Sequence, residues 1–159
     1  MKIEFGCGET PTKKDFKTCD IRNLRGIDFV CNAWEIDSLV EHNTVDEIYS
    51  RHFLEHLTFI QVDKYLKSCM NILKSNSIFE CEVPNMDFHI QQWIEGKEMK
   101  HAIAGFWGWQ REGMFNTWDI HKSGYNFKLL KEKLLQHGFI NVQKLESKPQ
   151  NLSVIAYKP

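Results

Sequence analysis

Short strand-like runs dominate the first half of this sequence, and they follow one another until a long amphipathic segment interrupts them. The runs are rich in branched and aromatic residues, and each ends in a polar or glycine-containing stop: "KIEF" (2–5), "KTCDI" (17–21), "IDFVC" (27–31) and "VDEIYS" (45–50). A chain that alternates such strands with helices usually forms a mostly parallel sheet. The pattern therefore predicts an α/β protein.

Two helices are predicted in the remainder of the chain. Residues 58–74, "TFIQVDKYLKSCMNILK", place apolar side chains at spacings of three and four, which is typical of an amphipathic helix. The second spans 126–138, where Asn126 can cap the start and Gly138 supplies a left-handed stop. Between them, over 85–125, the pattern loosens and many aromatic residues appear.

Three more strands complete the predicted sheet. The run "SIFECEVP" (77–84) is closed by Pro84, and "FINVQKLE" (139–146) and "LSVIAYK" (152–158) form a closing antiparallel pair joined through "SKPQN". The expected fold is a mostly parallel, seven-stranded sheet with an antiparallel C-terminal strand pair.

Length and charge limit the class of protein. A chain of 159 residues favours one domain, 1–159. Its 20 Lys and Arg against 21 Asp and Glu give a formal net charge of −1, so there is no clear signal for nucleic-acid binding. No apolar run approaches the roughly 18 residues of a membrane span, and the N-terminus does not resemble a signal peptide. We therefore expect a soluble, cytoplasmic protein of unknown oligomeric state.

Five cysteines without a CxxC pair argue against a disulfide framework and against a thiolate zinc site. Their odd number and scattered positions are typical of small apolar core residues. The cysteines are therefore predicted to be buried and unpaired.

Polar and glycine residues follow the first three predicted strands. In parallel sheets, ligands bind beyond the carboxyl ends of the strands. Gly6 and Gly8 form a tight turn after the first strand, Asp20 ends the second, and Asn32 follows the third. A glycine turn, an acid suited to ribose hydroxyls and an amide suited to an adenine edge together predict a nucleoside pocket.

With these residues in this order, the sequence resembles the class I S-adenosylmethionine-dependent methyltransferases, in particular small members with a shortened first helix. The likeness runs from "EFGCGE" through "VDEIYSRHFLEHL" and "ILKSNSIFECEVPN" to "LLKEKLLQHGFINVQKLE". It implies a Rossmann-like fold and S-adenosylmethionine as cofactor, with S-adenosylhomocysteine as product. The implied contacts are Gly6, Cys7 and Gly8 with the methionine part, Glu4 near its amino group, Asp20 with the ribose, Asn32 and Ala33 with adenine, and His52 at the tip of the fourth strand.

The chain departs from that family on the cofactor side. Only 11 residues separate Gly8 from Asp20, about half of what a helix with two loops takes. We therefore expect the first helices to be reduced. These short connections leave one alternative open, namely a methyltransferase-like protein that binds the cofactor or its product without turnover.

The segment "HFLEH" (52–56) matches the H-x-x-E-H pattern of a zinc peptidase. Zinc needs a third ligand and two histidines on a common helix face, but Thr58 is expected to cap a new helix, which leaves about one turn for the motif. We therefore expect no metal, with a zinc hydrolase as a weaker alternative. His56 is predicted to be a packed residue, hydrogen-bonded behind the strand, with a ligand-contacting role as the alternative.

Methyl transfer requires alignment of the acceptor and, for an oxygen or nitrogen nucleophile, a base. The predicted bases are His121, His52 and Asp119, with Asp87 as a further candidate. Residues 85–125 are expected to form a lid or substrate-side insertion, with hinges at its glycines. A fixed satellite core around Phe106, Trp107, Trp109 and Trp118 remains the alternative. The acceptor is expected to be a small molecule or glycan-like, and Arg111 is predicted to pair with a carboxylate or phosphate on it.

Overall fold

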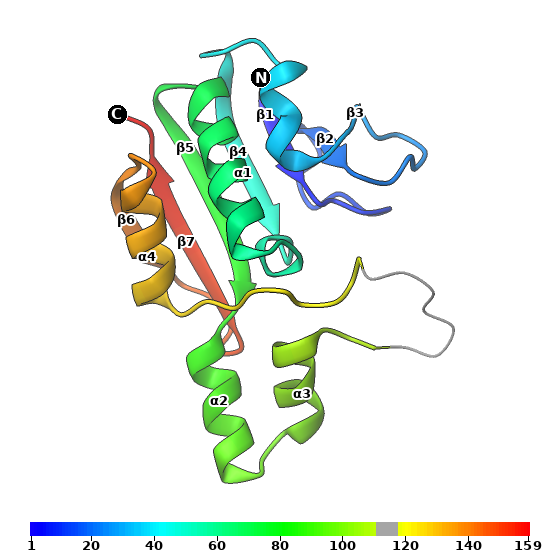
Figure 1. The fold of residues 1–159 in the computed structure, drawn as a ribbon, viewed down its shortest axis with the longest axis vertical. Helices are drawn as coiled ribbons and strands as arrows, with labels where there is room; N and C mark the ends of the chain where they lie inside the picture. Colours follow the sequence, from blue (N-terminus) through cyan, green and yellow to red (C-terminus); the bar gives the residue numbers. More distant parts are fainter. Residues whose placement is uncertain (111–117) are drawn as a thin grey trace.

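A computed structural model describes residues 1–110 and 118–159 of the chain. Seven strands form one sheet in the order β3-β2-β1-β4-β5-β7-β6 (Figure 1). Their bounds are β1 Lys2–Phe5, β2 Lys17–Asp20, β3 Phe29–Val30, β4 Val45–Arg51, β5 Leu73–Pro84, β6 Ile140–Leu145 and β7 Asn151–Tyr157. The strands β3, β2, β1, β4 and β5 pair in parallel, whereas β7 runs antiparallel to both β5 and β6. The predicted fold class is confirmed.

The helix α1 (Phe59–Ile72) begins with a capping box, because the side chain of Thr58 accepts a hydrogen bond from the backbone N–H of Gln61 and the Gln61 side chain accepts one from the Thr58 N–H. It ends before the predicted boundary because β5 starts at Leu73 rather than at Ser77. The added first part of β5 is irregular: the pairing register with β4 shifts, and Asn76 has a positive φ of 62°. The polar residues of this part do not show the apolar pattern of a strand, so the sequence did not predict it.

The second predicted helix is confirmed as α4 (Phe127–Gln136). The Asn126 side chain accepts a hydrogen bond from the N–H of Leu129, and Gly138 adopts a φ of 89° just past the end. This helix precedes the β6–β7 pair and packs beside it (Figure 1).

The connections on the N-terminal side of the sheet are short. Residues 6–16 and 21–28 contain no helix, and the connection after β3 holds only the 3₁₀ helix η1 (Ala33–Ser38). Right-handed crossovers place the helices between β3 and β4 and between β4 and β5 on the same face of the sheet, and η1, α1 and α4 lie together there (Figure 1). The prediction of reduced first helices is confirmed.

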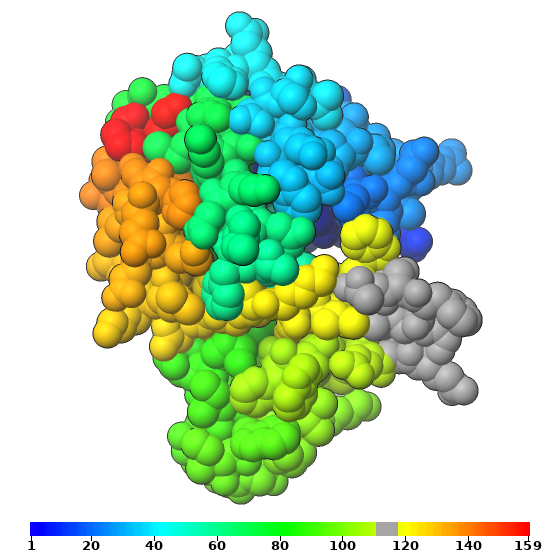
Figure 2. Space-filling model, viewed as in Figure 1, coloured from blue at the N-terminus to red at the C-terminus, as the bar shows by residue number. Residues whose placement is uncertain are grey.

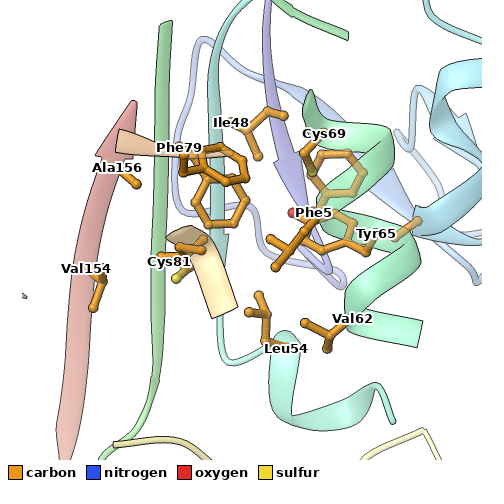
Figure 3. Packing of buried hydrophobic residues seen from close by; sticks show 14 of the residues in the cluster. Phe5, Ile48, Leu54, Val62, Tyr65, Cys69, Phe79, Cys81, Val154 and Ala156 are labelled. Carbon is orange, nitrogen blue, oxygen red and sulfur yellow. The ribbon is translucent and has the colours of Figure 1, made fainter. Parts of the chain in front are cut away.

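The main core lies between that face of the sheet and these helices (Figure 3). Tyr65 of α1 packs edge-on against Phe5 of β1, with ring centroids 5.1 Å apart, and Phe79 of β5 meets Phe139 at 5.0 Å. All four rings are almost wholly buried. Four of the five cysteines are also buried, as predicted, whereas Cys31 is only partly buried and its Sγ lies 3.7 Å from that of Cys19. This core holds the carboxyl ends of β1, β4 and β5 in a fixed relation.

The described residues within 85–125 are more regular than the sequence suggested. They contain two helices, α2 (Met86–Glu95) and α3 (Met99–Trp107), which pack against each other beyond the carboxyl end of β5 (Figure 1). Figure 2 shows them as a lobe below the sheet, with the segment that precedes α4 running along the junction. Exposed apolar residues on both helices, such as Ile94 and Ile103, weaken the amphipathic pattern and explain why they were missed.

Across the described part of the chain, no helix is long and apolar enough to cross a membrane.

Candidate functional site

The turn after β1 is shaped by a close contact with the segment after β4. Gly6 has a φ of 64°, and a Cβ atom there would lie 2.4 Å from the Phe53 ring. The Gly6 N–H donates to the carbonyl oxygen of Cys19, which joins the turn to β2. Glycine is therefore required here both by the backbone conformation and by the approach of Phe53.

Glu4 of β1 stabilises the loop that follows this turn. Its side chain is buried, and its two carboxylate oxygens accept hydrogen bonds from the backbone N–H groups of Thr12 and Lys13, at 2.9 and 2.8 Å. Cys7 is also buried, and burial raises the pKa of its thiol to about 11. In this structure both residues support the loop.

Asp20 ends β2 with its carboxylate already bonded. It accepts hydrogen bonds from the Gly8 N–H at 3.0 Å, and from the backbone N–H, Nε and Nη2 of Arg22 at 3.0 to 3.2 Å. Burial opposes its ionisation, but these bonds outweigh that effect and hold the pKa of the Asp20 carboxyl below its usual value. The Arg22 side chain is 41% exposed, so it can turn into solvent and release part of the carboxylate.

Asn32 and Ala33 lie where β3 leads into η1. The Asn32 side-chain amide donates to Glu35 at 2.9 Å, and Ala33 is buried as the first residue of η1. Asn32 and Asp20 both line one cavity.

That cavity, here called the glycine-loop cavity, has a volume of about 150 Å³. Five of the predicted cofactor-binding residues line it: Gly6, Asp20, Asn32, Ala33 and His52. Glu4, Cys7 and Gly8 are not among its lining residues. Trp34, Phe53 and Trp118 add aromatic walls. A carboxylate, an amide and flat rings around one space match the hydroxyls, amine and base of a nucleoside.

A second and larger space, here called the histidine cavity, has a volume of about 760 Å³ and lies toward α2 and α3. It is lined by five of the seven histidines: His52, His56, His89, His101 and His121. His52, His56 and Asp119 line both cavities, so the two spaces meet at these residues. A volume of this size suits a small-molecule ligand, whereas the glycine-loop cavity alone is below that range.

His52 lies at the tip of β4 in a strained conformation, with a φ of 48°. Its Nδ1 lies 3.2 Å from Oε1 of Glu55, and its Nε2 lies 3.7 Å from Oε1 of Glu82. A left-handed conformation in a residue other than glycine is uncommon and tends to occur at functional sites. The backbone turns sharply here and directs the His52 ring between two acids.

His121, predicted to be a catalytic base, lines the histidine cavity. Its Nδ1 lies 2.9 Å from the carbonyl oxygen of Gly105, so Nδ1 carries the proton and Nε2 keeps a lone pair. Burial lowers the pKa of His121, which favours the neutral ring at pH 7. Asp119 also lines the cavity, but Asp87 does not: its carboxylate accepts a hydrogen bond from Asn126.

The predicted role of His56 needs correction. It is hydrogen-bonded, with Nδ1 3.3 Å from the carbonyl oxygen of Ile120, but it faces both cavities rather than the space behind the strand. Its ring lies edge-on to that of His121, with centroids 5.0 Å apart. The one-turn 3₁₀ helix η2 (Leu54–His56) turns the ring in this direction.

The aromatic residues of 85–125 divide between the two predicted roles. Phe106 and Trp107 contact Trp93 and hold α2 against α3, as a satellite core would. Trp109 and Trp118 instead line the two cavities. Arg111, predicted to meet the substrate, lies outside the described residues.

Two of the glycines in this segment are required by close packing. A Cβ on Gly105 would lie 2.3 Å from the His89 ring, and one on Gly108 would lie 2.1 Å from the carbonyl oxygen of Asp119. Gly96 ends α2 in a left-handed conformation, with open space around it. Close approach accounts for Gly105 and Gly108 without hinge motion; Gly113 lies outside the described residues.

Comparison with solved structures identifies the fold. A S-adenosylmethionine-dependent methyltransferase from Archaeoglobus fulgidus superimposes with a TM-score of 0.68 at 19% identity, over 99% of this chain and 85% of that one. A methyltransferase from Methanosarcina mazei gives 0.65 at 14% identity, over 99% and 91%. The 1,6-didemethyltoxoflavin-N1-methyltransferase of Burkholderia thailandensis, solved with its substrate and S-adenosylhomocysteine, gives 0.63 at 13% identity, over 99% and 70%.

No protein-family model matches the sequence, and no curated protein matches it either. The fold is nevertheless that of the class I S-adenosylmethionine-dependent methyltransferases, as the sequence resemblance predicted. The identities are low, so the likeness establishes the architecture, and the chemistry has to be argued from the residues of this chain.

Proposed function

We propose that this protein transfers a methyl group from S-adenosylmethionine to a small-molecule or glycan-like acceptor. The observation that carries the proposal is the meeting of two cavities at the carboxyl edge of the sheet, with His52, His56 and Asp119 at their boundary. In open α/β sheets this edge is where ligands bind. A donor in one cavity and an acceptor in the other would meet at these side chains.

In this proposal the nucleoside end of the donor lies in the glycine-loop cavity. Asp20 would accept hydrogen bonds from the ribose hydroxyls after Arg22 turns away, and Asn32 with the backbone at Ala33 would contact the base. Glu4, Cys7 and Gly8 would act through the shape of the loop. The small volume of this cavity implies that the donor also extends toward the boundary lined by His52.

S-adenosylmethionine supplies an electrophilic methyl group on a sulfonium, so the protein has to align the acceptor and accept its proton. Three side chains can take that proton: His121 through its Nε2 lone pair, His52 and Asp119. The segment 85–125 would act as the lid over the acceptor, since Trp109 of this segment and His101 of α3 line the histidine cavity.

Transfer of a labelled methyl group tests this proposal. The protein is mixed with methyl-labelled S-adenosylmethionine and a panel of hydroxyl and amine acceptors, including sugars and a metabolite extract of the organism that makes the protein. We expect label in at least one acceptor, and less label with Asp20→Ala at the same, non-saturating donor concentration. Tight binding of S-adenosylhomocysteine with no transfer to any acceptor would favour the binding protein without turnover.

A further inference from the structure

A cluster of three side chains lining the histidine cavity has the composition of a metal site, and one of them, His56, also lines the glycine-loop cavity. One potential ligand atom from each of Glu55, His56 and His121 lies within 4.8 Å of the other two. Glu55 and His56 come from the turn after β4, and His121 comes from the segment before α4. His52, the other histidine of the H-x-x-E-H pattern, is not in this group; its Nδ1 faces Glu55.

The carboxylate of Glu55 is incompletely satisfied. Glu55 is 1% exposed, and Oε1 faces His52, but Oε2 is buried and has no hydrogen-bond partner among the described residues. A buried carboxylate oxygen without a partner is costly. A cation bound to Oε2 would remove that cost, so this atom independently indicates a ligand.

Both histidines are prepared to bind through the same ring nitrogen. A carbonyl oxygen only accepts hydrogen bonds, so the contacts of His56 Nδ1 with Ile120 and of His121 Nδ1 with Gly105 place the proton on Nδ1 in each ring. Each Nε2 therefore keeps a lone pair. A backbone carbonyl on the second nitrogen is the usual support of a metal-binding histidine, because it fixes the tautomer and the ring orientation.

The backbone also fixes the two halves of the cluster to each other. The carbonyl oxygen of Glu55 accepts hydrogen bonds from the N–H groups of Lys122 and Ser123, at 2.7 and 3.2 Å, and the Ser123 hydroxyl donates to the carbonyl of Leu54. The segment that carries His121 is thus held against the turn that carries Glu55 and His56. A cation about 2.1 Å from each ligand needs ligand atoms about 3.4 Å apart, so side chains whose ligand atoms now lie within 4.8 Å of one another would have to close around the ion.

We propose that Glu55, His56 and His121 bind one first-row divalent cation of the zinc type, and that the acceptor is a hydroxyl compound whose oxygen coordinates this cation. Two imidazoles and one carboxylate suit Zn²⁺, Co²⁺ or Fe²⁺ better than Mg²⁺ or Ca²⁺. Three protein ligands leave at least one coordination position, which would face the histidine cavity. This reverses the expectation from the sequence that the protein binds no metal.

The acceptor half of this inference rests on the proposed methyl transfer, whereas the cation site does not. A bound cation lowers the pKa of a coordinated hydroxyl and makes it a better nucleophile. On transfer, the oxygen–carbon bond forms as the carbon–sulfur bond of the sulfonium breaks, its electron pair stays on sulfur, and the hydroxyl proton leaves to His52, Asp119 or solvent. His121 would then serve as a ligand rather than as the base.

Metal titration of the full chain tests the site. Protein stripped with a chelator is titrated with Zn²⁺ by calorimetry and with Co²⁺ by visible absorption, with Mg²⁺ as a comparison. We expect one equivalent of Zn²⁺ and Co²⁺, weaker binding of Mg²⁺, and no sulfur-to-cobalt charge-transfer band. Such a band would place the ion on cysteines instead and overturn the proposal, as would the absence of Zn²⁺ binding at millimolar concentration.

Variants locate the ion. Glu55→Gln, His56→Gln and His121→Gln should each weaken Zn²⁺ binding by about 100-fold or more, beyond the 10- to 100-fold effect of losing a supporting residue. His101→Gln is the matched control, because His101 lines the same cavity outside the cluster, and it should retain one equivalent. Unchanged affinity in a folded His121→Gln would overturn the proposal even if Glu55→Gln fails to fold.

A parallel titration with S-adenosylhomocysteine separates this inference from the proposed function. Nucleoside binding without metal binding would overturn the cation site and leave methyl transfer standing. Metal binding without nucleoside binding would do the reverse. If both bind, the pH dependence of transfer with a hydroxyl acceptor should shift when Co²⁺ replaces Zn²⁺, and an unchanged profile would contradict the coordination of the acceptor.

Discussion

The two cavities differ in how far their polar groups are already satisfied. Around the glycine-loop cavity, Asp20 is bonded to Arg22 and Gly8, and Asn32 is bonded to Glu35. Around the histidine cavity, Glu55 Oε2 and His89 Nδ1 are buried without a hydrogen-bond partner in the described part of the chain. A ligand in the glycine-loop cavity therefore has to replace hydrogen bonds that the protein already makes. A ligand in the histidine cavity can instead form hydrogen bonds with atoms that have no partner among the described residues.

This difference fits the reduced helices on the N-terminal side. With residues 6–16 and 21–28 free of helix, the acids at the ends of β1 and β2 are used to hold the short loops in place. The histidine cavity lies between the sheet and the α2–α3 lobe. Each of these two parts is held together by its own core, so the side chains that line the cavity are not needed to hold it in place. Among the described residues, the histidine cavity is therefore lined by side chains with polar atoms still left to bind a ligand.

The largest effect is expected on the histidine side. His121→Ala should lower methyl transfer by about 100-fold or more, because it removes a ligand of the proposed cation that activates the acceptor hydroxyl, and should leave affinity for S-adenosylhomocysteine unchanged. Turnover and calorimetric affinity are measured on the same preparation. Loss of nucleoside binding would make His121 part of the nucleoside pocket, and full activity would show that neither His121 nor a cation bound to it acts in the transfer.

The next largest effect is expected at Asp20, where ribose hydroxyls would replace the hydrogen bonds from Arg22. Asp20→Ala should weaken nucleoside binding by about ten- to a hundredfold, because charge-assisted bonds to the ribose are worth roughly 1.5 to 3 kcal/mol. Arg22→Ala should instead strengthen binding by up to about fivefold, since a partly exposed ion pair contributes up to about 1 kcal/mol. Weaker binding in Arg22→Ala would show that the guanidinium contacts the ligand rather than competing with it.

A pair of glycine variants tests the close contact after β1. Gly6→Ala and Gly96→Ala impose alanine at nearly the same φ, 64° and 66°, but only Gly6 has a neighbour within 4 Å. The left-handed conformation should cost about 1 to 2 kcal/mol in both, and the clash with Phe53 should add to this in Gly6→Ala alone. Urea unfolding measures the difference, and equal losses would mean that Phe53 moves aside freely.

The smallest effect is a pH dependence of stability. Burial lowers the pKa of His89 below 6.5, its Nε2 faces the carbonyl of Gln150, and His101 and His121 lie near enough to oppose its protonation. As pH falls through about 6.5, the unfolded chain takes up a proton that the folded chain resists, so the free energy of unfolding falls until the folded pKa is passed. In chelated protein the melting temperature should drop by a few degrees from pH 7.5 to 5.5. His89→Gln should reduce this slope and exposed His42→Gln should not; equal slopes in all three proteins would contradict it.

The sheet and its main helices could be predicted because buried strands appear as short apolar runs, and buried helix faces appear as apolar residues spaced three and four apart. The position of Asp20 and Asn32 at one cavity could be predicted because strand ends in a parallel sheet share one edge. The helices α2 and α3 were missed because Ile94 and Ile103 remain exposed and Gly105 lies inside α3. The meeting of His56 with His121 depends on how the segment before α4 returns to the sheet, and no local pattern encodes that return.

Binding of S-adenosylhomocysteine tests the central claim most directly. At about 100 times its dissociation constant, a ligand adds roughly 2.7 kcal/mol to the stability of the folded protein, which raises the melting temperature of a chain of this size by several degrees. We expect that rise with S-adenosylhomocysteine in the wild type, and a smaller one with Asp20→Ala at the same concentration. No change in melting temperature and no calorimetric heat at millimolar S-adenosylhomocysteine would contradict the account.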